Sequence, residues 1–150
     1  MDQVDRKILN LLQENSKITI KELSAKLNLS TTPIFERIKR LEKEGVISNY
    51  VAILDKDKIG KKLTAFIHIS LSNHTRDAVD EFARVVIQHD EVKACYHVTG
   101  SSDFLLKIMV EDMEAYNTYI QDKLAVAPYL GKVESRFSLS ARKDTHMFRL

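Results

Sequence analysis

Residues 19–47, TIKELSAKLNLSTTPIFERIKRLEKEGVI, constrain the fold more than any other stretch, because they predict two helices joined by a tight turn. Thr19 and Glu22 have capping-box spacing, in which a hydroxyl and a carboxylate satisfy the backbone donors at a helix start. The apolar repeat of the first helix breaks before Ser30, a favourable N-cap for a second helix that ends at Gly45. This arrangement predicts a helix-turn-helix.

The second helix of the pair has an apolar side formed by Ile34, Ile38 and Leu41. Because successive residues advance about 100° around a helix, the opposite side carries polar and basic side chains. In helix-turn-helix docking, the N-terminal part of the second helix contacts base edges, and basic side chains further along bind phosphates. The predicted base-reading residues are Thr31, Thr32 and Glu36, and the predicted phosphate contacts are Lys39, Arg40 and Lys43, with Ser30 at the helix start.

Segments on either side of the helix pair extend the predicted domain. Residues 2–14 have apolar side chains at helical spacing and predict a further amphipathic helix, which would close a three-helix core. After the pair the chain reads VISNYVAILD, which is strand-like, and residues 51–54 predict a short pairing strand. We therefore expect a helix-turn-helix domain over residues 1–50 and a linker with a short strand over residues 51–62.

Beyond the charged sequence DKDKIGKKL, the chain shows regular changes of periodicity. Alternation predicts strands and helical spacing predicts helices. The expected elements are a strand at 63–71, a helix at 77–88, strands at 92–98 and 104–110, a helix at 113–126 and a strand at 133–139. This βαββαβ order, with two helices on one face of an antiparallel sheet, predicts a ferredoxin-like domain over residues 63–141, followed by a C-terminal tail at 142–150.

One face of the predicted sheet has no helix to cover it. Phe66, Leu105 and Met109 lie on this face and are still apolar, so contact with the sheet of a second subunit would bury them. We expect a homodimer built through this domain. Such a dimer would supply two recognition helices for two half-sites.

Composition narrows the classes of function. A net charge of +2 and a pI near 8.6 are mild, so any nucleic-acid contact depends on local placement of charge. No apolar run approaches a membrane span and the N-terminus has no signal-peptide core, so we expect a cytoplasmic protein without a membrane partner. The single Cys95 is interpreted as an apolar filler, and the histidines lack metal-ligand spacing. We predict no catalytic residue, metal or cofactor.

The peptide LSTTPIFERIKRLEKEGVI resembles the recognition helix of the Lrp/AsnC transcriptional regulators, also called feast/famine regulatory proteins. MDQVDRKILNLLQEN resembles the first helix of that family. Arg37 matches the arginine of the family pattern, but its place about 60° from the apolar stripe favours a structural or phosphate-binding role. The resemblance implies an α+β protein, with a winged helix-turn-helix domain before a ferredoxin-like, ACT-like domain of the type called RAM.

The segment VTGSSDFLL, residues 98–106, looks like the Gly-x-x-Asp signature of the family's regulatory domain, which binds small amino acids at subunit contacts. A glycine lets a ligand carboxylate approach backbone donors, and an aspartate accepts from an ammonium group. The same pair would also make a plain hairpin turn. The effector-binding residues expected from the match, or from expected proximity to this loop, are His97, Thr99, Gly100, Ser101, Ser102, Asp103, Ser135, Ser138 and Ser140.

The resemblance implies a sequence-specific DNA-binding transcriptional regulator whose assembly or DNA binding responds to a small amino-acid effector. The expected partners are double-stranded DNA, the amino acid and further copies of the chain, as a homodimer and an octamer of dimers. Two alternatives remain: a siroheme-decarboxylase-like enzyme, which shares the two-domain plan, and a metabolite-binding assembly module without a DNA function. The tail is given no function.

Overall fold

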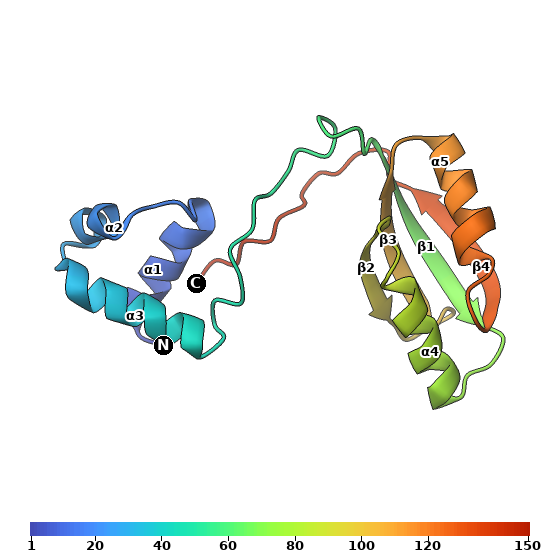
Figure 1. The fold of residues 1–150 in the computed structure, drawn as a ribbon, viewed down its shortest axis with the longest axis horizontal. Helices are drawn as coiled ribbons and strands as arrows, with labels where there is room; N and C mark the ends of the chain where they lie inside the picture. Colours follow the sequence, from blue (N-terminus) through green and yellow to red (C-terminus); the bar gives the residue numbers. More distant parts are fainter. The chain divides into compact units, whose positions relative to one another are not determined.

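The computed structural model describes residues 1–150, which divide into two compact units (Figure 1). The first unit contains residues 1–53 together with 143–150, and the second contains residues 54–142. The second unit is therefore inserted in the sequence between two parts of the first. The C-terminal segment, expected to be a separate tail, belongs to the first unit.

Three helices form the first unit: α1 (Gln3–Glu14), α2 (Ile20–Leu27) and α3 (Thr31–Lys43). Each presents an apolar stripe to a common core, in which Ile8, Leu23 and Ile34 are fully buried. Helices with one apolar stripe are stable only when that stripe is covered, so the three helices depend on one another. The expected three-helix domain is confirmed.

Local capping sets where these helices begin. Asp2 and Asp5 form a capping box at the start of α1, and Thr19 and Glu22 form the expected box at the start of α2. Ser30 occupies the N-cap of α3 with extended backbone, but its hydroxyl makes no capping hydrogen bond. That hydroxyl is consequently available for another partner at the start of α3.

The short strand expected at residues 51–54 is not formed, and this prediction is wrong. Val51 and Leu54 are exposed, and Ile53 is 72% exposed. A strand gains stability only by pairing, and the four-stranded sheet of the chain does not include this segment. Its apolar, extended sequence is thus present without the partner that would make it a strand.

The second unit has the expected βαββαβ order, confirming the ferredoxin-like fold (Figure 1). Its elements are β1 (Leu63–Leu71), α4 (Arg76–Val86), β2 (Val92–His97), β3 (Phe104–Val110), α5 (Met113–Thr118), the π-helix η1 (Tyr119–Leu124) and β4 (Leu130–Phe137). The strands form one antiparallel sheet in the order β2-β3-β1-β4. The two central strands are therefore the buried, strongly apolar ones.

Alternation along β1 and β3 separates the two faces of the sheet. Ile67 and Leu106 are buried in the core with Phe82 of α4, on the helix-covered face. Phe66 lies on the other face, where it is half-buried and opposite Lys107 of β3. Leu105 and Met109 share that open face, as the sequence predicted.

The helix expected at residues 113–126 changes type midway. The α-helix ends at Thr118, and residues 119–124 continue as a π-helix. A π-turn has i→i+5 hydrogen bonds, so it shifts the phase of every side chain that follows. Tyr119 at the start of this segment is only 1% exposed, whereas Met113 at the start of α5 is exposed.

The last strand begins three residues before the expected Val133, at Leu130. Its start crosses a register shift opposite Ser70 and Leu71 of β1. A Cβ at Gly131 would lie 2.6 Å from the carbonyl oxygen of Ser70. Only glycine allows the two backbones to approach this closely.

Gly131→Ala should therefore lower the free energy of unfolding by more than about 2 kcal/mol, because backbone atoms must move to admit the methyl group. Gly60→Ala is the matched control. Gly60 has a φ of +79° but open space around it, so alanine there should cost only about 1 kcal/mol. Urea denaturation followed by circular dichroism measures both, and equal losses would contradict the close approach.

Candidate DNA-binding and effector-binding sites

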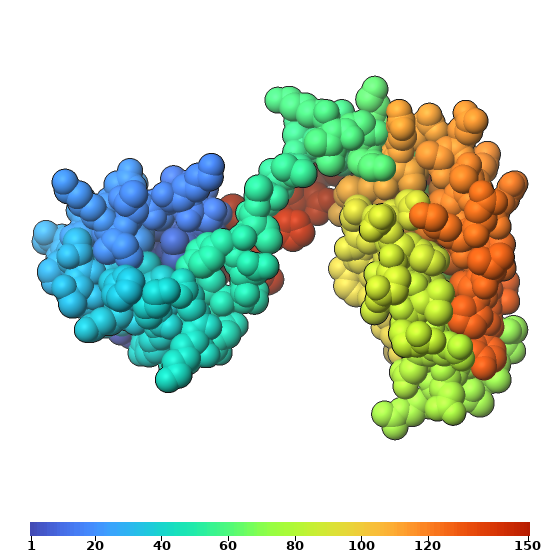
Figure 2. Space-filling model, in the orientation of Figure 1, coloured from blue at the N-terminus to red at the C-terminus, as the bar shows by residue number.

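The outer side of α3 is open, as expected for a recognition helix. Thr31, Thr32 and Glu36 are exposed along its first two turns, and Lys43 is exposed at its last residue. The space-filling view shows α3, in cyan, as an outer surface of the first unit (Figure 2). The side chains assigned to base and phosphate contacts are thus accessible, apart from Arg37, which is half-buried.

A buried carboxylate on α1 binds two arginines of α3. The Asp5 side chain is 1% exposed and accepts hydrogen bonds from Arg37 Nη1 and Arg40 Nη2, each at 2.7 Å. Arg37 also reaches the Asp2 carboxylate at 2.6 Å. Burial raises the pKa of Asp5, but hydrogen bonds from the Asp2 amide and the two guanidinium groups lower it to about 2. The carboxylate is therefore charged, and it fixes the rotation of α3 against α1.

This ion-pair cluster separates the basic residues of α3 by role. Arg37 is occupied by two carboxylates, which agrees with its structural interpretation. Arg40 is held on one side by Asp5, yet its side chain remains 46% exposed, so a phosphate contact stays a prediction. Lys39 is paired with Glu42 at 2.9 Å, whereas Lys43 makes no ion pair.

One exposed residue of α3 was missed by the sequence reasoning. Phe35 is 50% exposed, and the Lys39 ammonium lies 5.8 Å from its ring centroid. Phe35 therefore adds an apolar surface to the otherwise polar outer side of α3. The sequence reasoning assigned Phe35 no role, since it lies outside the apolar stripe of Ile34, Ile38 and Leu41 and is not polar.

The loop between β2 and β3 is held onto the end of β1 by Asp103. Its carboxylate accepts a 2.7 Å hydrogen bond from the Leu71 amide, and its other oxygen lies 3.1 Å from His74 Nδ1. Its own amide donates to the Ile69 carbonyl at 2.8 Å. Gly100 has a φ of +121°, which side chains rarely adopt. The turn interpretation thus has direct structural support, while one carboxylate oxygen faces the exposed His74.

A hollow of about 220 Å³ lies on the open face of the sheet beside this loop. Ser102 Oγ lies 3.3 Å from His68 Nδ1, and the Ser70 hydroxyl donates to the Ser101 carbonyl at 3.2 Å. The residues that line the hollow are His68, Ser70, Ser101, Ser102, Lys132, Glu134 and Arg136. Ser101 and Ser102 were expected there, whereas the charged row of β4 was missed, because its pairing with β1 became known only from the register.

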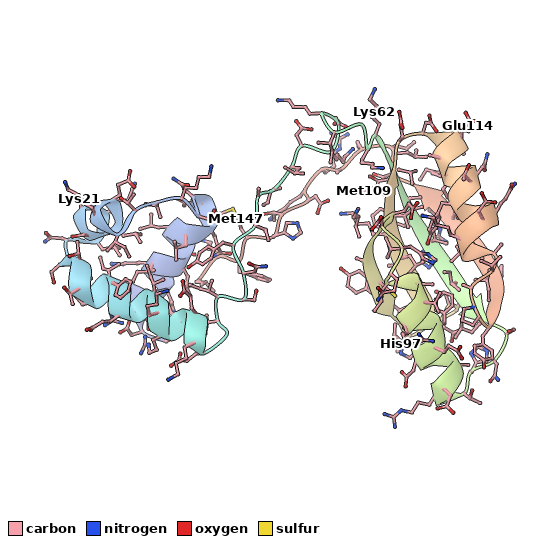
Figure 3. The ribbon with its side chains drawn as sticks, in the orientation of Figure 1. Lys21, Lys62, His97, Met109, Glu114 and Met147 are labelled. Carbon is pink, nitrogen blue, oxygen red and sulfur yellow. The ribbon has the colours of Figure 1, made fainter.

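The structure does not bring all the predicted effector residues together. Ser138 was chosen for proximity to the loop, but its amide donates to the Thr64 carbonyl, at the far end of β1. Thr64 and Ile69 are five residues apart, or about 17 Å along a strand. Figure 3 shows Met109, which pairs with Thr64, and His97 toward opposite ends of the sheet. The proximity assumed for Ser138, and for Ser140 beyond it, is wrong.

The remaining effector candidates occupy different surroundings. His97 is exposed and stacks on Phe104, with ring centroids 5.1 Å apart. Ser135 accepts a 2.5 Å hydrogen bond from the Tyr116 hydroxyl, so it faces α5 and not the hollow. Thr99 is exposed in the loop. Of the expected effector residues, only Ser101 and Ser102 therefore line the hollow.

No group of three or more His, Cys, Asp or Glu side chains is arranged to hold a metal ion. None of the helices is long and apolar enough to cross a membrane.

Comparison with known proteins matches each of the two units to a protein family. Residues 1–48 match the winged helix-turn-helix DNA-binding family, and residues 64–148 match the Lrp/AsnC ligand binding domain. The chain belongs to the Lrp/AsnC family. The family of the sequence resemblance is thereby confirmed, together with its two-domain order.

Named relatives cover nearly the whole chain. The DNA-binding transcriptional activator DecR of Escherichia coli K12 is 36% identical over 145 residues, which are 97% of this chain and 95% of DecR. The leucine-responsive regulatory protein of the same strain is 38% identical over 128 residues, which are 85% of this chain and 78% of that protein. Both are named as regulators, as expected for this Lrp/AsnC protein.

Solved structures agree with this assignment. A transcriptional regulator from Neisseria meningitidis, crystallised as an L-Met complex, has a TM-score of 0.92 and 36% identity, covering 97% of this chain and 94% of its own. An AsnC family regulator from Agrobacterium tumefaciens has a TM-score of 0.94 and 36% identity, covering 99% and 96%. The Lrp/AsnC fold is shared along the entire chain.

Replacing the buried carboxylate tests the anchoring of the recognition helix. Asp5→Asn should lower the free energy of unfolding of the first unit at pH 7 by about 3 kcal/mol, because two arginines lose a buried partner. The folded-state pKa of Asp5, about 2, lies below its ordinary 3.8. Its contribution is therefore complete above about pH 4 and is lost as the pH falls through about 2.

Urea titrations between pH 7 and pH 2.5 measure this effect. The loss of stability on acidification should be smaller in Asp5→Asn than in the unmodified protein. Asp2→Asn is the control, since the Asp2 side chain is 53% exposed and should matter less. Equal stabilities of the Asp5 variant and the unmodified protein at pH 7 would contradict the anchoring role.

Proposed function

We propose that this protein is a sequence-specific transcriptional regulator, which binds double-stranded DNA through α3 and responds to a small amino acid bound by its second unit. The observation that carries the proposal is the open, polar surface of α3, held in a fixed rotation by the buried Asp5. A recognition helix needs both features, because base reading requires accessible side chains in a defined orientation.

In this proposal the first two turns of α3 read bases. Glu36 can accept a hydrogen bond from a cytosine amino group, and the threonine hydroxyls can donate or accept. The hydroxyl of Ser30 makes no capping bond and is available to contact the DNA backbone at the start of α3. Lys43 and the exposed part of Arg40 bind phosphates, and Lys39 does so by leaving Glu42. Phe35 adds an apolar surface suited to a thymine methyl group.

We further propose that two copies pair through the open faces of their sheets. Phe66, Leu105 and Met109 supply apolar area on that face. The outward row of β4 alternates in charge, with Lys132 and Arg136 on either side of Glu134. A two-fold axis that passes between Lys132 and Glu134 would place the lysine of each copy opposite the glutamate of the other. The dimer would carry two recognition helices, and rings of dimers, up to an octamer of dimers, would carry more.

The proposed effector site combines the loop at residues 98–103 with the neighbouring hollow. An amino acid carries one carboxylate and one ammonium group. Lys132 and Arg136 are suited to the carboxylate, while Asp103 is suited to the ammonium group. This proposal is supported by the charged side chains around the hollow. It is also supported by one relative solved with L-Met and one named as leucine-responsive. His97, Thr99, Gly100, Ser101 and Ser102 would complete the site.

Regulation then follows from differential binding. The amino acid must bind one assembly or domain arrangement more tightly than another, because equal affinity for both would shift nothing. A site beside the proposed sheet-to-sheet contact meets this requirement, since ligand and second copy would touch the same face. A metabolite-binding module without a DNA function is distinguished by measuring salt-dependent DNA affinity, which that alternative lacks.

Two substitutions on α3 test DNA recognition. Lys43→Ala should weaken binding to all sequences alike and reduce the salt slope by about 1, whereas Glu36→Ala should change which base is preferred. Lys61→Ala, which removes the same charge from the second unit, should do neither. Fluorescence anisotropy with the DNA upstream of the protein's own gene, and with single-base variants of it, measures both effects. Parallel losses on every sequence for both variants would exclude base reading by α3.

A third substitution tests the effector site. Asp103→Asn keeps an oxygen that can accept from the Leu71 amide but removes the negative charge. We expect this variant to lose affinity for amino acids and to retain DNA affinity. His74→Ala removes the other partner of Asp103 and should leave ligand affinity within about twofold, since the charge remains. Calorimetric titration with individual amino acids decides, and unchanged affinity in Asp103→Asn would remove Asp103 from the site.

A further inference from the structure

The C-terminal residues are held by two side-chain amides of α1. Gln13 Nε2 donates to the Phe148 carbonyl at 2.9 Å, and Gln13 Oε1 accepts from the Phe148 amide at 2.6 Å. Asn10 makes the same pair of bonds with Leu150, at 3.1 and 3.3 Å. Each amide thus satisfies both backbone groups of one residue, as a neighbouring strand does in an antiparallel sheet.

The spacing of the two contacts is matched. Asn10 and Gln13 are three residues apart on α1, which brings side chains to the same surface of a helix. Phe148 and Leu150 are two residues apart, and alternate residues of an extended chain direct their backbone groups to the same side. A shift by one residue would turn those groups away. The amide pair therefore sets the register of the segment bound to it.

Asn10 and Gln13 bind the backbone of the C-terminal segment and not its side chains. Phe148 is 75% exposed, although both of its backbone groups are bonded. Asn10 and Gln13 are themselves half-buried, on a side of α1 about 140–200° from the core residue Ile8. This surface is distinct from the Asp5 cluster and from the exposed side of α3.

We propose that Asn10 and Gln13 form a docking surface for an extended peptide, and that residues 147–150 of the same chain are its occupant and a second tether for the DNA-binding unit. The chain leaves that unit at Ile53 and returns to it at Lys143. The return follows directly from β4, which carries three of the residues that line the hollow. This second role rests on the proposed function. The tether would give an amino acid bound at β4 a route to act on α1, and through Asp5 on α3.

The test compares the unmodified protein with Asn10→Ala/Gln13→Ala and with a matched pair on the same helix, Lys7→Ala/Glu14→Ala. Hydrogen exchange of the Phe148 and Leu150 amides reports docking. We expect exchange at least about tenfold slower than in an unstructured peptide for the unmodified and matched proteins, and unstructured rates for the amide variant. The amides of β4 should be unchanged in all three. Unstructured rates in the unmodified protein would overturn the docking.

DNA anisotropy with and without a pool of amino acids reports the coupling. The amide variant should keep its DNA affinity without amino acids within about twofold, while the change caused by the pool shrinks at least about threefold. An undiminished change in a variant whose tail is released would overturn the tether. Absence of any effect of amino acids on the unmodified protein would instead count against the proposed function, and hydrogen exchange would still decide whether the segment docks on α1.

Discussion

The recognition surface depends on one buried carboxylate. Asp5 is charged, almost fully enclosed and satisfied by the Asp2 amide and two guanidinium groups from α3. A charge in such a place is tolerated only when its partners are present, so Arg37 and Arg40 must both turn toward α1. Their turning determines which residues of α3 face outward. The polar face that would meet DNA is therefore defined by a contact on the flank of the same helix.

Charge is used differently in the two units. On α3 of the first unit, Arg37 binds two carboxylates, Lys39 binds one, and Lys43 makes no ion pair. The free energy needed to move each side chain onto a phosphate therefore differs along one helix. In the second unit, charged residues lie on a strand beside serines, on a face with apolar neighbours. Such a face can serve a ligand and a subunit contact together, which links binding to assembly without a long pathway.

Local features were predictable, and features that depend on a distant partner were not. Capping at Thr19 and the alternation along β1 are properties of short windows, so the sequence alone located them. The strand at residues 51–54 failed because pairing needs a second strand. Ser138 was misplaced because its neighbours follow from the register of β4 on β1. The change from α-helix to π-helix at Tyr119 was likewise not visible in the sequence pattern. The ion pair between Asp5 and Arg40 spans 35 residues of sequence and leaves no local signal.

The insertion of the second unit within the first has a consequence for the order of folding. The core of the three helices uses residues between Val4 and Ile47, so it can form as soon as that segment has been synthesised. The bonds from Gln13 to Phe148 close a separation of 135 residues and must wait until the whole ferredoxin-like domain has been made. During synthesis the DNA-binding unit therefore exists first with the amide surface of α1 vacant, and it is completed only by the segment translated after β4.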